Sequence, residues 1–343
     1  MGVQITELLQ AKEISLDQLK GKTIAVDAHL FLYQFLTTIR QRDGTPLSDS
    51  KGRITSHLIG LFTRSSSLMR SGLKLAYVFD GKAPELKEKE RERRKEQKIA
   101  AKVKYEEAAE KEDIENMRKY AARTSRLTPD MIQESKKLIT AMGIPIVQAP
   151  SEGEAQAAFM VKSSDAFAVA SQDADSLLFG STYLIRNLSM AGKRKRTNKL
   201  AYETISPQLI SLSETLNHLG IDQGQLIALA MLVGTDFNPG GIKGIGPKNA
   251  IKLVKSHGRD FDALFREVKW DEQNATPWNE IFHLIKDMPV SSDYKLKWAL
   301  PDKEKITRLL VDEHDFSMER VQSALEKFEK DESAPQKGLG EFF

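Results

Sequence analysis

Four short apolar segments of the chain alternate with longer stretches in which apolar residues recur at helical spacing. The longer stretches include LFLYQFLTTIR (30–40) and MIQESKKLITAMG (131–143). Strands that alternate with helices favour a mostly parallel central sheet covered by helices on both faces, so the pattern predicts an α/β fold. The apolar segments have the length and composition of buried strands. They are KTIAVD (22–27), LKLAYVFD (73–80), GIPIVQAP (143–150) and AFAVASQD (166–173).

The segment 85–119 interrupts this alternation, because 23 of its 35 residues are charged and no apolar stripe runs along it. This composition is typical of a solvated helix with i,i+4 ion pairs. Because it is inserted between two core strands, it also fits a flexible lid or arch. From Ile221 to about Lys330 the pattern is helical again, and DESAPQKGLGEFF (331–343) is polar apart from its last residues. We therefore expect a single domain over 1–330 and a flexible tail over 331–343.

Composition excludes several classes of protein. No stretch approaches the roughly 20 apolar residues that span a bilayer, and the start has no signal-peptide pattern. The chain contains no cysteine, which rules out disulfides and thiolate catalysis and favours an intracellular protein. MGVQIT (1–6) fits the loose pattern for N-myristoylation, which is an alternative for the first residues. A net charge of +3 decides nothing about nucleic acid.

Acidic residues stand where the predicted strands end. Ligands of open α/β sheets bind at the carboxyl ends of the strands, so these side chains should gather at one edge. Each residue taken singly has a structural alternative, since Asp is common in turns and Ser151 with Glu154 fits a capping box. The candidates are Asp27, Asp80, Glu152, Glu154, Asp173 and Asp175, with Asp236 in LVGTDF as a seventh.

Seven carboxylates at one edge would repel one another strongly. Two unit charges about 4 Å apart repel by roughly 4 kcal/mol at an effective dielectric constant of 20. The repulsion of several such pairs exceeds the ~5–15 kcal/mol by which a domain is stable. Protonation would relieve part of it, but near pH 7 the binding of divalent cations is the favoured explanation. An all-oxygen site without cysteine or a histidine pair favours Mg²⁺ or Mn²⁺ over Zn²⁺. Two such ions can support the in-line cleavage of a phosphodiester.

Two segments have features of nucleic-acid binding. GGIKGIGPKNAIKLV (240–254) matches a helix–hairpin–helix, with a helix that begins near Pro247. Backbone N–H groups at such a helix start bind phosphate, and the side chains of Lys243 and Lys248 add positive charge. A plain glycine-rich turn is the alternative. GKRKRTNK (192–199) is a basic run that fits a phosphate-contacting loop, a solvated hairpin tip or a localisation signal.

Together these motifs resemble those of the structure-specific 5′ nucleases, most closely the flap-endonuclease type of archaea. The resemblance covers essentially the whole chain, and the seven acids, their order and the helix–hairpin–helix all agree. It implies one nuclease domain over 1–330 with a helical arch. Its parts are an N-terminal block (1–84), the charged arch (85–128), an internal block (129–240) and a helix–hairpin–helix with C-terminal helices (241–330).

The resemblance also implies roles for individual residues. Asp27, Asp80, Glu152 and Glu154 would surround one Mg²⁺ ion, and Asp173, Asp175 and Asp236 a second, with Mn²⁺ able to substitute. Lys87 and Arg94 match a basic pair that contacts the scissile phosphate. Without the resemblance, both would be interpreted as ordinary solvated charges. Tyr33 matches an aromatic residue that stacks on a base, although alone it would read as core. The implied DNA contacts are Gly2, Thr55, Arg64, Lys193, Arg194, Lys195, Arg196, Lys243, Gly244, Gly246 and Lys248, with a K⁺ ion as a further candidate at the hairpin.

The tail matches a sliding-clamp-binding box of the form Q-x-x-hydrophobic-x-x-F-F. In one helical turn its apolar side chains project together, and docking explains their presence in a polar tail. The implied partner is the clamp PCNA, bound through residues 336–343, while the chain alone would be a monomer without a membrane partner. The residues of the box are Gln336, Leu339, Phe342 and Phe343.

The expected function is hydrolysis of phosphodiesters at junctions between a 5′ flap and duplex DNA, with 5′–3′ exonuclease activity, in replication (Okazaki fragment processing) and repair. Such a protein would act in the cytoplasm at the nucleoid, or in the nucleus of a eukaryote. One alternative is a Mg²⁺-dependent small-molecule phosphatase, because DADS (173–176) resembles the Asp-x-Asp nucleophile of haloacid-dehalogenase-type enzymes. The other is a non-catalytic DNA-binding partner of the clamp, which would leave the seven acids without a purpose.

Overall fold

A seven-stranded mixed sheet runs through the centre of the computed structural model, which describes residues 3–41, 43–111, 113–121, 124–190, 192–195 and 202–332. The spatial order of the strands is β1-β9-β6-β5-β2-β3-β4. Its strands are β1 (Ala11–Glu13), β2 (Thr23–Asp27), β3 (Lys74–Phe79), β4 (Ile146–Gln148), β5 (Ala168–Ala170), β6 (Tyr183–Arg186) and β9 (Gln208–Ser211). A separate hairpin pairs β7 (Gly192–Lys195) with β8 (Tyr202–Ile205).

The four strands predicted from the apolar segments are β2, β3, β4 and β5, and they are neighbours in the sheet. β2 pairs in parallel with both β3 and β5, and β3 pairs in parallel with β4. The predicted α/β class with a mostly parallel sheet is therefore confirmed. β6 continues the parallel part, whereas β9 pairs antiparallel with β6 and β1, and these three strands were not predicted.

The sheet is buried on both faces because alternate residues of its central strands enter two different hydrophobic cores. In β2, Ile24 and Val26 point into one core and Ala25 into the other, and all three are fully buried. Helices cover the first face: α1 (Ala28–Thr38), α2 (Ser56–Arg70), α5 (Pro129–Ala141), α14 (Lys303–Thr307) and α15 (Met318–Glu332). The other core includes α6 (Gly153–Lys162), α7 (Asp175–Leu178), α8 (Leu212–Leu219), α9 (Gln223–Val233), α10 (Pro247–His257), α11 (Phe261–Glu267), α12 (Trp270–Gln273) and α13 (Trp278–Lys286). Short turns complete the chain: η1 (Thr6–Leu8), η2 (Asp17–Leu19), η3 (Glu85–Lys87), η5 (Leu188–Met190) and the π-helical η6 (Arg308–Asp312).

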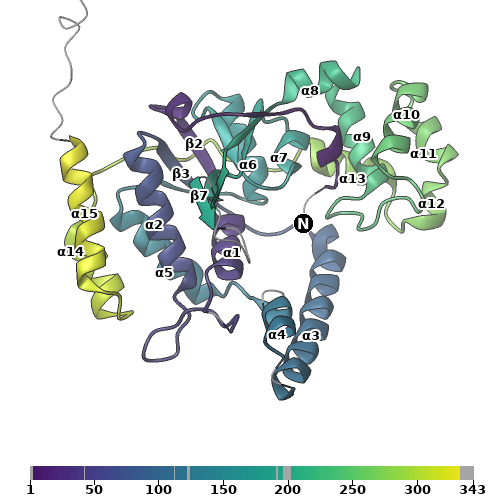
Figure 1. Ribbon diagram of the computed structural model, residues 1–343. Helices are drawn as coiled ribbons and strands as arrows, with labels where there is room; N and C mark the ends of the chain where they lie inside the picture. The colour runs from purple at the N-terminus through teal and green to yellow at the C-terminus, as the bar shows by residue number, and fades with distance from the viewer. Residues whose placement is uncertain are drawn as a thin grey trace, which may run out of the picture.

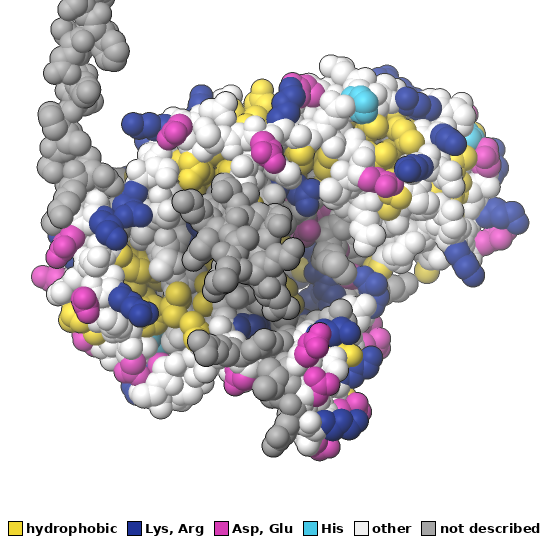
Figure 2. All heavy atoms as spheres, viewed as in Figure 1, with side chains coloured by type: hydrophobic (Ala, Val, Ile, Leu, Met, Phe, Trp, Pro, Cys, Tyr) yellow, Lys and Arg dark blue, Asp and Glu magenta, His cyan; other side chains and the backbone are white. Residues whose placement is uncertain are grey.

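The charged segment forms two helices, α3 (Glu88–Glu110) and α4 (Ile114–Ala121), which pack against each other and project from the body of the protein (Figure 1). Basic and acidic side chains are mixed over the surface of this projection (Figure 2). Some of them form ion pairs one helical turn apart, such as Lys102 with Glu106 at 3.6 Å. The helical prediction for this segment is therefore confirmed.

The helix predicted to begin near Pro247 is also present. Pro247 occupies the first turn of α10 and Gly246 is its N-cap. The preceding helix α9 is apolar on all sides because it lies between other helices, and its residues from Leu226 to Leu232 are buried. Between the two helices runs the glycine-rich loop 234–246. Among the helices in the described ranges, none is long and apolar enough to cross a membrane.

Candidate active site

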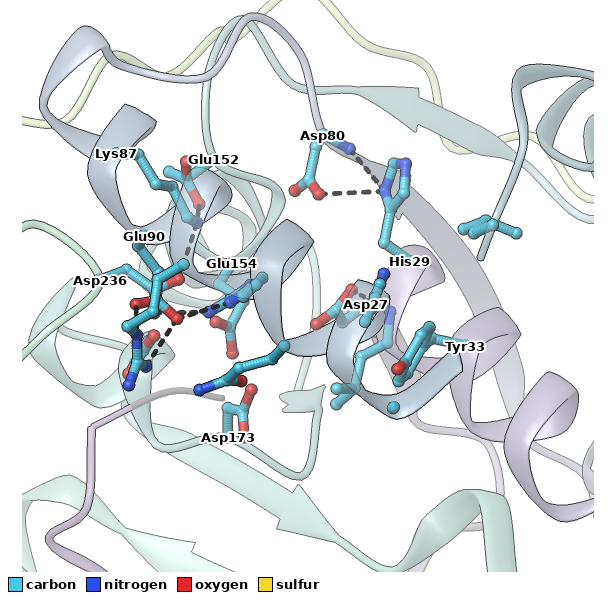
Figure 3. A pocket seen from close by; sticks show the side chains of 18 of the residues that line it. Asp27, His29, Tyr33, Asp80, Lys87, Glu90, Glu152, Glu154, Asp173 and Asp236 are labelled. Atoms are coloured by element: carbon cyan, nitrogen blue, oxygen red, sulfur yellow. Dashed lines mark hydrogen bonds and ion pairs between the residues drawn. The ribbon is translucent and has the colours of Figure 1, made fainter. Parts of the chain in front are cut away.

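A cavity of about 900 Å³ opens between the carboxyl edge of the sheet and the projecting helix α3. All seven predicted acidic residues line it, and the side chains labelled in Figure 3 point into it from several elements. They belong to parts of the chain up to 209 residues apart, from Asp27 to Asp236. The prediction that these acids gather at one edge is therefore confirmed by their placement.

The first two acids are held by backbone N–H groups. Asp27 ends β2 and is the N-cap of α1, where its Oδ1 accepts a 3.1 Å hydrogen bond from the Leu30 N–H. Asp80 follows β3, and its Oδ1 accepts a 2.7 Å hydrogen bond from the Gly153 N–H at the start of α6. A Cβ atom at Gly153 would lie 2.6 Å from that same oxygen, so any larger residue here would force the Asp80 carboxylate to move.

Glu152 and Glu154 reach the cavity from the start of α6. The capping-box interpretation of Ser151 and Glu154 is wrong, because Glu152 is the N-cap and makes no side-chain cap hydrogen bond. Glu154 Oε1 instead accepts a 2.9 Å hydrogen bond from Ser171 Oγ, one residue beyond β5. The same hydroxyl lies 3.4 Å from Asp27 Oδ2, so Ser171 links two of the buried carboxylates.

The remaining acids come from the turn after β5 and the turn after α9. Asp173 lies in the first turn, and Asp175 begins α7. Asp175 Oδ1 accepts a 2.7 Å hydrogen bond from the Val3 N–H, so the N-terminal segment helps to hold this carboxylate. Asp236 lies in a buried turn that Asn238 closes by accepting hydrogen bonds from the N–H and hydroxyl of Thr235.

Burial and repulsion by neighbouring acids raise the pKa values of Asp27, Glu154 and Asp175. Burial, followed by the charge of Asp80, raises the pKa of Asp27 to about 8. Burial and the charge of Asp173 raise the pKa of Asp175 to about 7. Burial, and then the charges of Asp175 and Asp27, raise the pKa of Glu154. The cluster therefore cannot ionise fully near neutral pH unless positive charge enters it.

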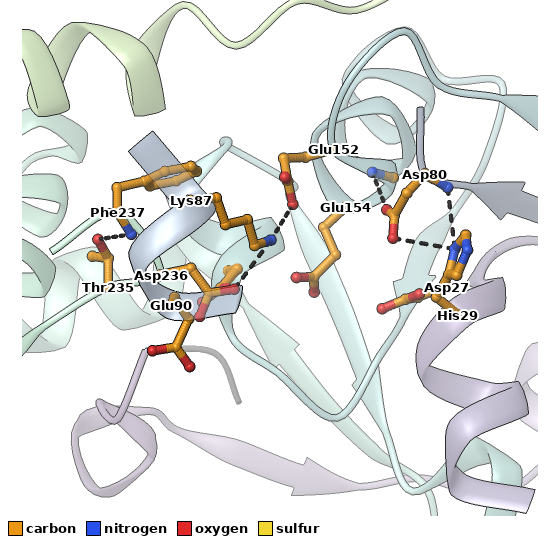
Figure 4. Close-up of polar contacts among 12 residues, drawn as sticks. Asp27, His29, Asp80, Lys87, Glu90, Glu152, Glu154, Thr235, Asp236 and Phe237 are labelled. Carbon is orange, nitrogen blue, oxygen red and sulfur yellow. Dashed lines mark hydrogen bonds and ion pairs between the residues drawn. The ribbon is translucent and has the colours of Figure 1, made fainter. Parts of the chain in front are cut away.

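Two basic side chains supply part of that charge. Lys87 Nζ lies 2.6 Å from Glu152 Oε2 and 3.1 Å from Asp236 Oδ2 (Figure 4). Arg94 Nη2 donates to Asp236 Oδ1 at 2.7 Å, and Arg94 Nε donates to Glu90 Oε1 at 2.7 Å. Burial alone would lower the pKa of Lys87, but the charges of Glu152 and Asp236 raise it, so this ammonium group stays protonated. Neither side chain is an ordinary solvated charge.

Among the cavity residues that the sequence did not single out, two contact the acids or their basic partners. His29 lies on α1, where its Nδ1 accepts from the Asp80 N–H at 3.2 Å and lies 3.1 Å from Asp80 Oδ2. Glu90 is almost fully buried and accepts hydrogen bonds from Arg93 and Arg94. A polar residue in the apolar stretch 28–36 was a signal for His29, whereas Glu90 is one acid among many in the charged segment.

Apart from Lys87 and Arg94, the one described residue predicted to contact DNA that lines the cavity is Tyr33. Its ring faces the cavity, with Lys98 Nζ 5.4 Å from the ring centre, so the core interpretation is wrong. Thr55 is buried at the N-cap of α2, and Arg64 is half-buried within that helix.

The other predicted DNA contacts lie elsewhere or outside the described residues. The loop before α10 carries Lys243 and Gly244, with Gly246 and Lys248 at the start of the helix. Residues 193–195 of the basic run, Lys193, Arg194 and Lys195, lie on β7 of the hairpin. The predictions for Gly2, Arg196, Gln336, Leu339, Phe342 and Phe343 fall outside the described residues.

The donor set is chemically suited to magnesium. Carboxylate oxygens from five segments converge without cysteine, and hard divalent cations prefer such ligands. As the side chains stand, no three acidic or histidine residues of the described ranges enclose a position for an ion. Lys87 meanwhile lies between Glu152 and Asp236 as a cation, and Arg94 pairs with Asp236. The buried, repelling acids fit a divalent cation that takes over this neutralising role.

Family models and known proteins agree with this architecture. The XPG N-terminal domain matches residues 1–101 and the XPG I-region matches residues 143–236. Flap endonuclease 1 of Hyperthermus butylicus is 54% identical over 96% of this chain and 95% of that protein. Flap endonuclease 1 of Pyrococcus abyssi is 54% identical over 96% of this chain and 94% of its own length.

Solved structures of flap endonucleases and related nucleases are also similar to this chain. Flap endonuclease-1 from Methanococcus jannaschii superposes with a TM-score of 0.75 and 43% identity, covering 96% of this chain and 98% of that one. The catalytic core of Rad2 in complex with a DNA substrate has a TM-score of 0.67 at 24% identity, covering 92% of this chain and 95% of that one, and shares the fold. This family is one of nucleases, which excludes both the phosphatase and the non-catalytic alternative. The chain belongs to the flap endonuclease 1 family, in its archaeal type, and carries both XPG regions of that family.

Proposed function

We propose that this chain is a Mg²⁺-dependent endonuclease that hydrolyses phosphodiesters where a 5′ flap leaves duplex DNA. The observation that carries the proposal is the single cavity in which seven carboxylates face Lys87 and Arg94. Acids alone would suit many metal enzymes, but two basic side chains at the same site also suit an anionic substrate. We include a 5′–3′ exonuclease activity, because the same cavity would act on a recessed 5′ end.

The acids divide into two groups that would each hold a divalent ion, Mg²⁺ or Mn²⁺. Glu154 stands between the groups, since its pKa is raised by Asp175 and Asp173 on one side and by Asp27 on the other. Its link to Asp27 through Ser171 supports placing it with the first group. The first group is Asp27, Asp80, Glu152 and Glu154, and the second is Asp173, Asp175 and Asp236.

Two such ions, when bound, activate water and stabilise charge on the attacking and leaving oxygens of an in-line displacement. The chain's own cations would act on the phosphate. Lys87 and Arg94 pair with Glu152 and Asp236 in the structure, so ion binding would free both side chains to neutralise the scissile phosphoryl oxygens. Hydrolysis then leaves a 5′-phosphate and a 3′-hydroxyl. Tyr33, at the edge of the acids, would stack on the base beside the cut.

Duplex DNA would be held at several positions away from the cavity. The start of α10 presents backbone N–H groups beside Lys243 and Lys248, a sequence-independent grip on phosphates. Gly244 has φ +84°, which favours glycine in this loop, and we propose a K⁺ ion beside it as part of the same contact. The residues Thr55, Arg64, Gly244, Gly246 and the run Lys193, Arg194, Lys195 and Arg196 would add backbone contacts, with Gly2 near the DNA.

We further propose that the protein acts as a monomer that is recruited by the sliding clamp PCNA through residues 336–343. This recruitment would place it at the nucleoid in replication and repair. The support is the spacing of Gln336, Leu339, Phe342 and Phe343, which fits a short amphipathic plug on a polar linker.

The proposed activity is tested with an end-labelled duplex that carries a 5′ flap, alongside matched single-stranded and blunt duplex DNA. We expect cutting near the junction of the flapped duplex in Mg²⁺ and none in EDTA. The single strand and the blunt duplex should give no product at the corresponding position. Equal cutting of all three substrates, or cutting that survives EDTA, would contradict the proposal.

Deletion of residues 336–343 should leave unstimulated flap cleavage unchanged and remove the stimulation by the clamp. The reason is that these residues would bind only the clamp and lie after α15, the last described helix. The measurement is the cleavage rate with and without the clamp. A matched variant that replaces only Phe342 and Phe343 by alanine should behave like the deletion. Stimulation that persists in both variants would refute the role of the tail.

A further inference from the structure

The end of the cavity away from the acids has a different chemistry, of which the proposed reaction uses only Tyr33, at the border with the acids. We call it the distal end and define it by Tyr33, Lys98, Lys104, Tyr120 and Leu127. These side chains come from α1, α3, α4 and the segment before α5. The distal end therefore lies where the projecting helices meet the body of the protein.

Two aromatic rings at the distal end are each paired with lysine. Lys98 Nζ lies 5.4 Å from the centre of the Tyr33 ring. Lys104 Nζ lies 5.8 Å, and Lys119 Nζ 5.5 Å, from the centre of the Tyr120 ring. Tyr120 is half-buried, so part of its ring surface is open to the cavity. A planar ring flanked by ammonium groups suits a base with its phosphate, because bases stack on aromatic rings while lysine neutralises the backbone.

The lysines Lys98 and Lys104, which lie over the two rings, are both on α3. Lys98 and Lys104 are six residues apart on this helix, which corresponds to a rise of about 9 Å. Stacked nucleotides of one strand are separated by about 3.4 Å, so this distance accommodates more than one nucleotide. An unpaired strand that leaves the acids could therefore meet Tyr33 first and Tyr120 a few nucleotides further along.

We infer that Tyr120 is a second stacking platform for an unpaired base of the 5′ flap, with Lys104 and Lys119 contacting the adjacent phosphates. This inference rests on the proposed flap endonuclease function and adds a substrate-positioning residue to it. It assigns to α4 the role of sensing how far the unpaired strand extends beyond the junction. A flap too short to reach Tyr120 lacks this contact, so the enzyme binds longer flaps more tightly.

Tyr120 also packs α4 on α3 through Lys104, and the test must separate packing from stacking. Tyr120→Phe keeps both the ring and the packing. Tyr120→Leu keeps an apolar contact and removes the aromatic surface. The matched change in the ligand is a flap with one abasic position, which removes a base and leaves the phosphates in place.

The test combines the substitutions at Tyr120 with the abasic flap in a double-mutant cycle. The quantity measured is the equilibrium binding of flapped duplexes in EDTA. On an intact flap we expect Tyr120→Leu to weaken binding about tenfold, which corresponds to the loss of one stacked base. One abasic position should weaken binding by the unaltered chain to a similar extent, and Tyr120→Leu should then cause no further loss. Tyr120→Phe should restore the binding of the intact flap.

A scan of abasic positions along the flap needs only the unaltered chain, so it remains informative if Tyr120→Leu does not fold. It should reveal a sensitive position a few nucleotides from the junction, separate from the one next to Tyr33. Additive losses in the cycle, or no second sensitive position, would overturn the inference. If the unaltered chain neither binds nor cuts a flapped duplex, the proposed function itself has failed. Normal cutting with no coupling at Tyr120 overturns only the role of Tyr120.

Discussion

Asp175→Asn is expected to cut a 5′-flap duplex at least about a thousandfold more slowly than the unaltered chain while binding the same duplex normally. The loss corresponds to several kcal/mol of transition-state stabilisation, the size expected when a metal site loses a charged ligand. Asp175 is half-buried in the cavity at the start of α7, where its carboxylate accepts a hydrogen bond from the Val3 N–H. The measurement is the single-turnover cleavage rate in Mg²⁺ together with equilibrium binding in EDTA.

The fold should survive this substitution. Asparagine is nearly isosteric, and its side-chain oxygen can still accept the hydrogen bond from the Val3 N–H. Replacing one of several repelling acids by a neutral group also relieves repulsion, so thermal stability in EDTA should be equal or higher. Lost activity together with retained binding and retained stability would place Asp175 in the chemistry.

Asp271→Asn is the matched control, because Asp271 is an exposed acid in the first turn of α12, away from the cavity. It makes the same chemical change at a similar helical position, and it should cut at the normal rate. If Asp175→Asn cuts within a few-fold of the unaltered chain, Asp175 does not hold a catalytic ion and the assignment of the second group fails.

The location of the acids could be predicted from sequence because it depends on short-range pattern and on topology. The strands β2, β3 and β5 lie in apolar segments that can be recognised in the sequence, and an acid stands at the end of each strand or within three residues after it. Parallel pairing then brings their carboxyl ends to one edge, whatever the details of packing. The same reasoning could not find β6 (YLIR) and β9 (QLIS), because their few apolar residues do not form part of a longer apolar segment, and β9 also pairs antiparallel.

The partners of the acids could not be predicted, because they depend on three-dimensional proximity rather than on local pattern. The segment 85–119 contains 12 basic residues with similar surroundings in sequence, and nothing local marks Lys87 as the one that reaches Glu152. For Glu154 the local pattern predicted a contact that does not form. Its spacing from Ser151 fits a capping box, but in the fold its carboxylate accepts a hydrogen bond from Ser171 instead. Local rules failed where long-range contacts compete with them.

In EDTA, the free energy of unfolding should fall as the pH rises from about 5 to about 8, and Mg²⁺ should suppress most of this fall. The pKa of Asp27 rises from its ordinary value of 3.8 to about 8 in the folded protein, and that of Asp175 to about 7. Between those values the folded chain binds more protons than the unfolded chain. The resulting stability is complete below the unfolded pKa and is lost as the pH passes the folded pKa. For Asp27 alone the change is on the order of 5 kcal/mol. Urea unfolding at several pH values measures it.

Asp27→Asn separates this explanation from a general effect of pH. It removes one titrating group while its side-chain oxygen can still cap α1 at Leu30, so stability in EDTA should depend less on pH. At about pH 8 this variant should be more stable than the unaltered chain in EDTA and less stable in Mg²⁺, because the ion would lose a ligand. Asp271→Asn should change neither the pH dependence of stability in EDTA nor the effect of Mg²⁺ on stability. A free energy of unfolding that stays constant from about pH 5 to 8 in EDTA would show that the acids do not retain protons. If Asp27→Asn is not less stable than the unaltered chain in Mg²⁺, Asp27 does not hold the ion.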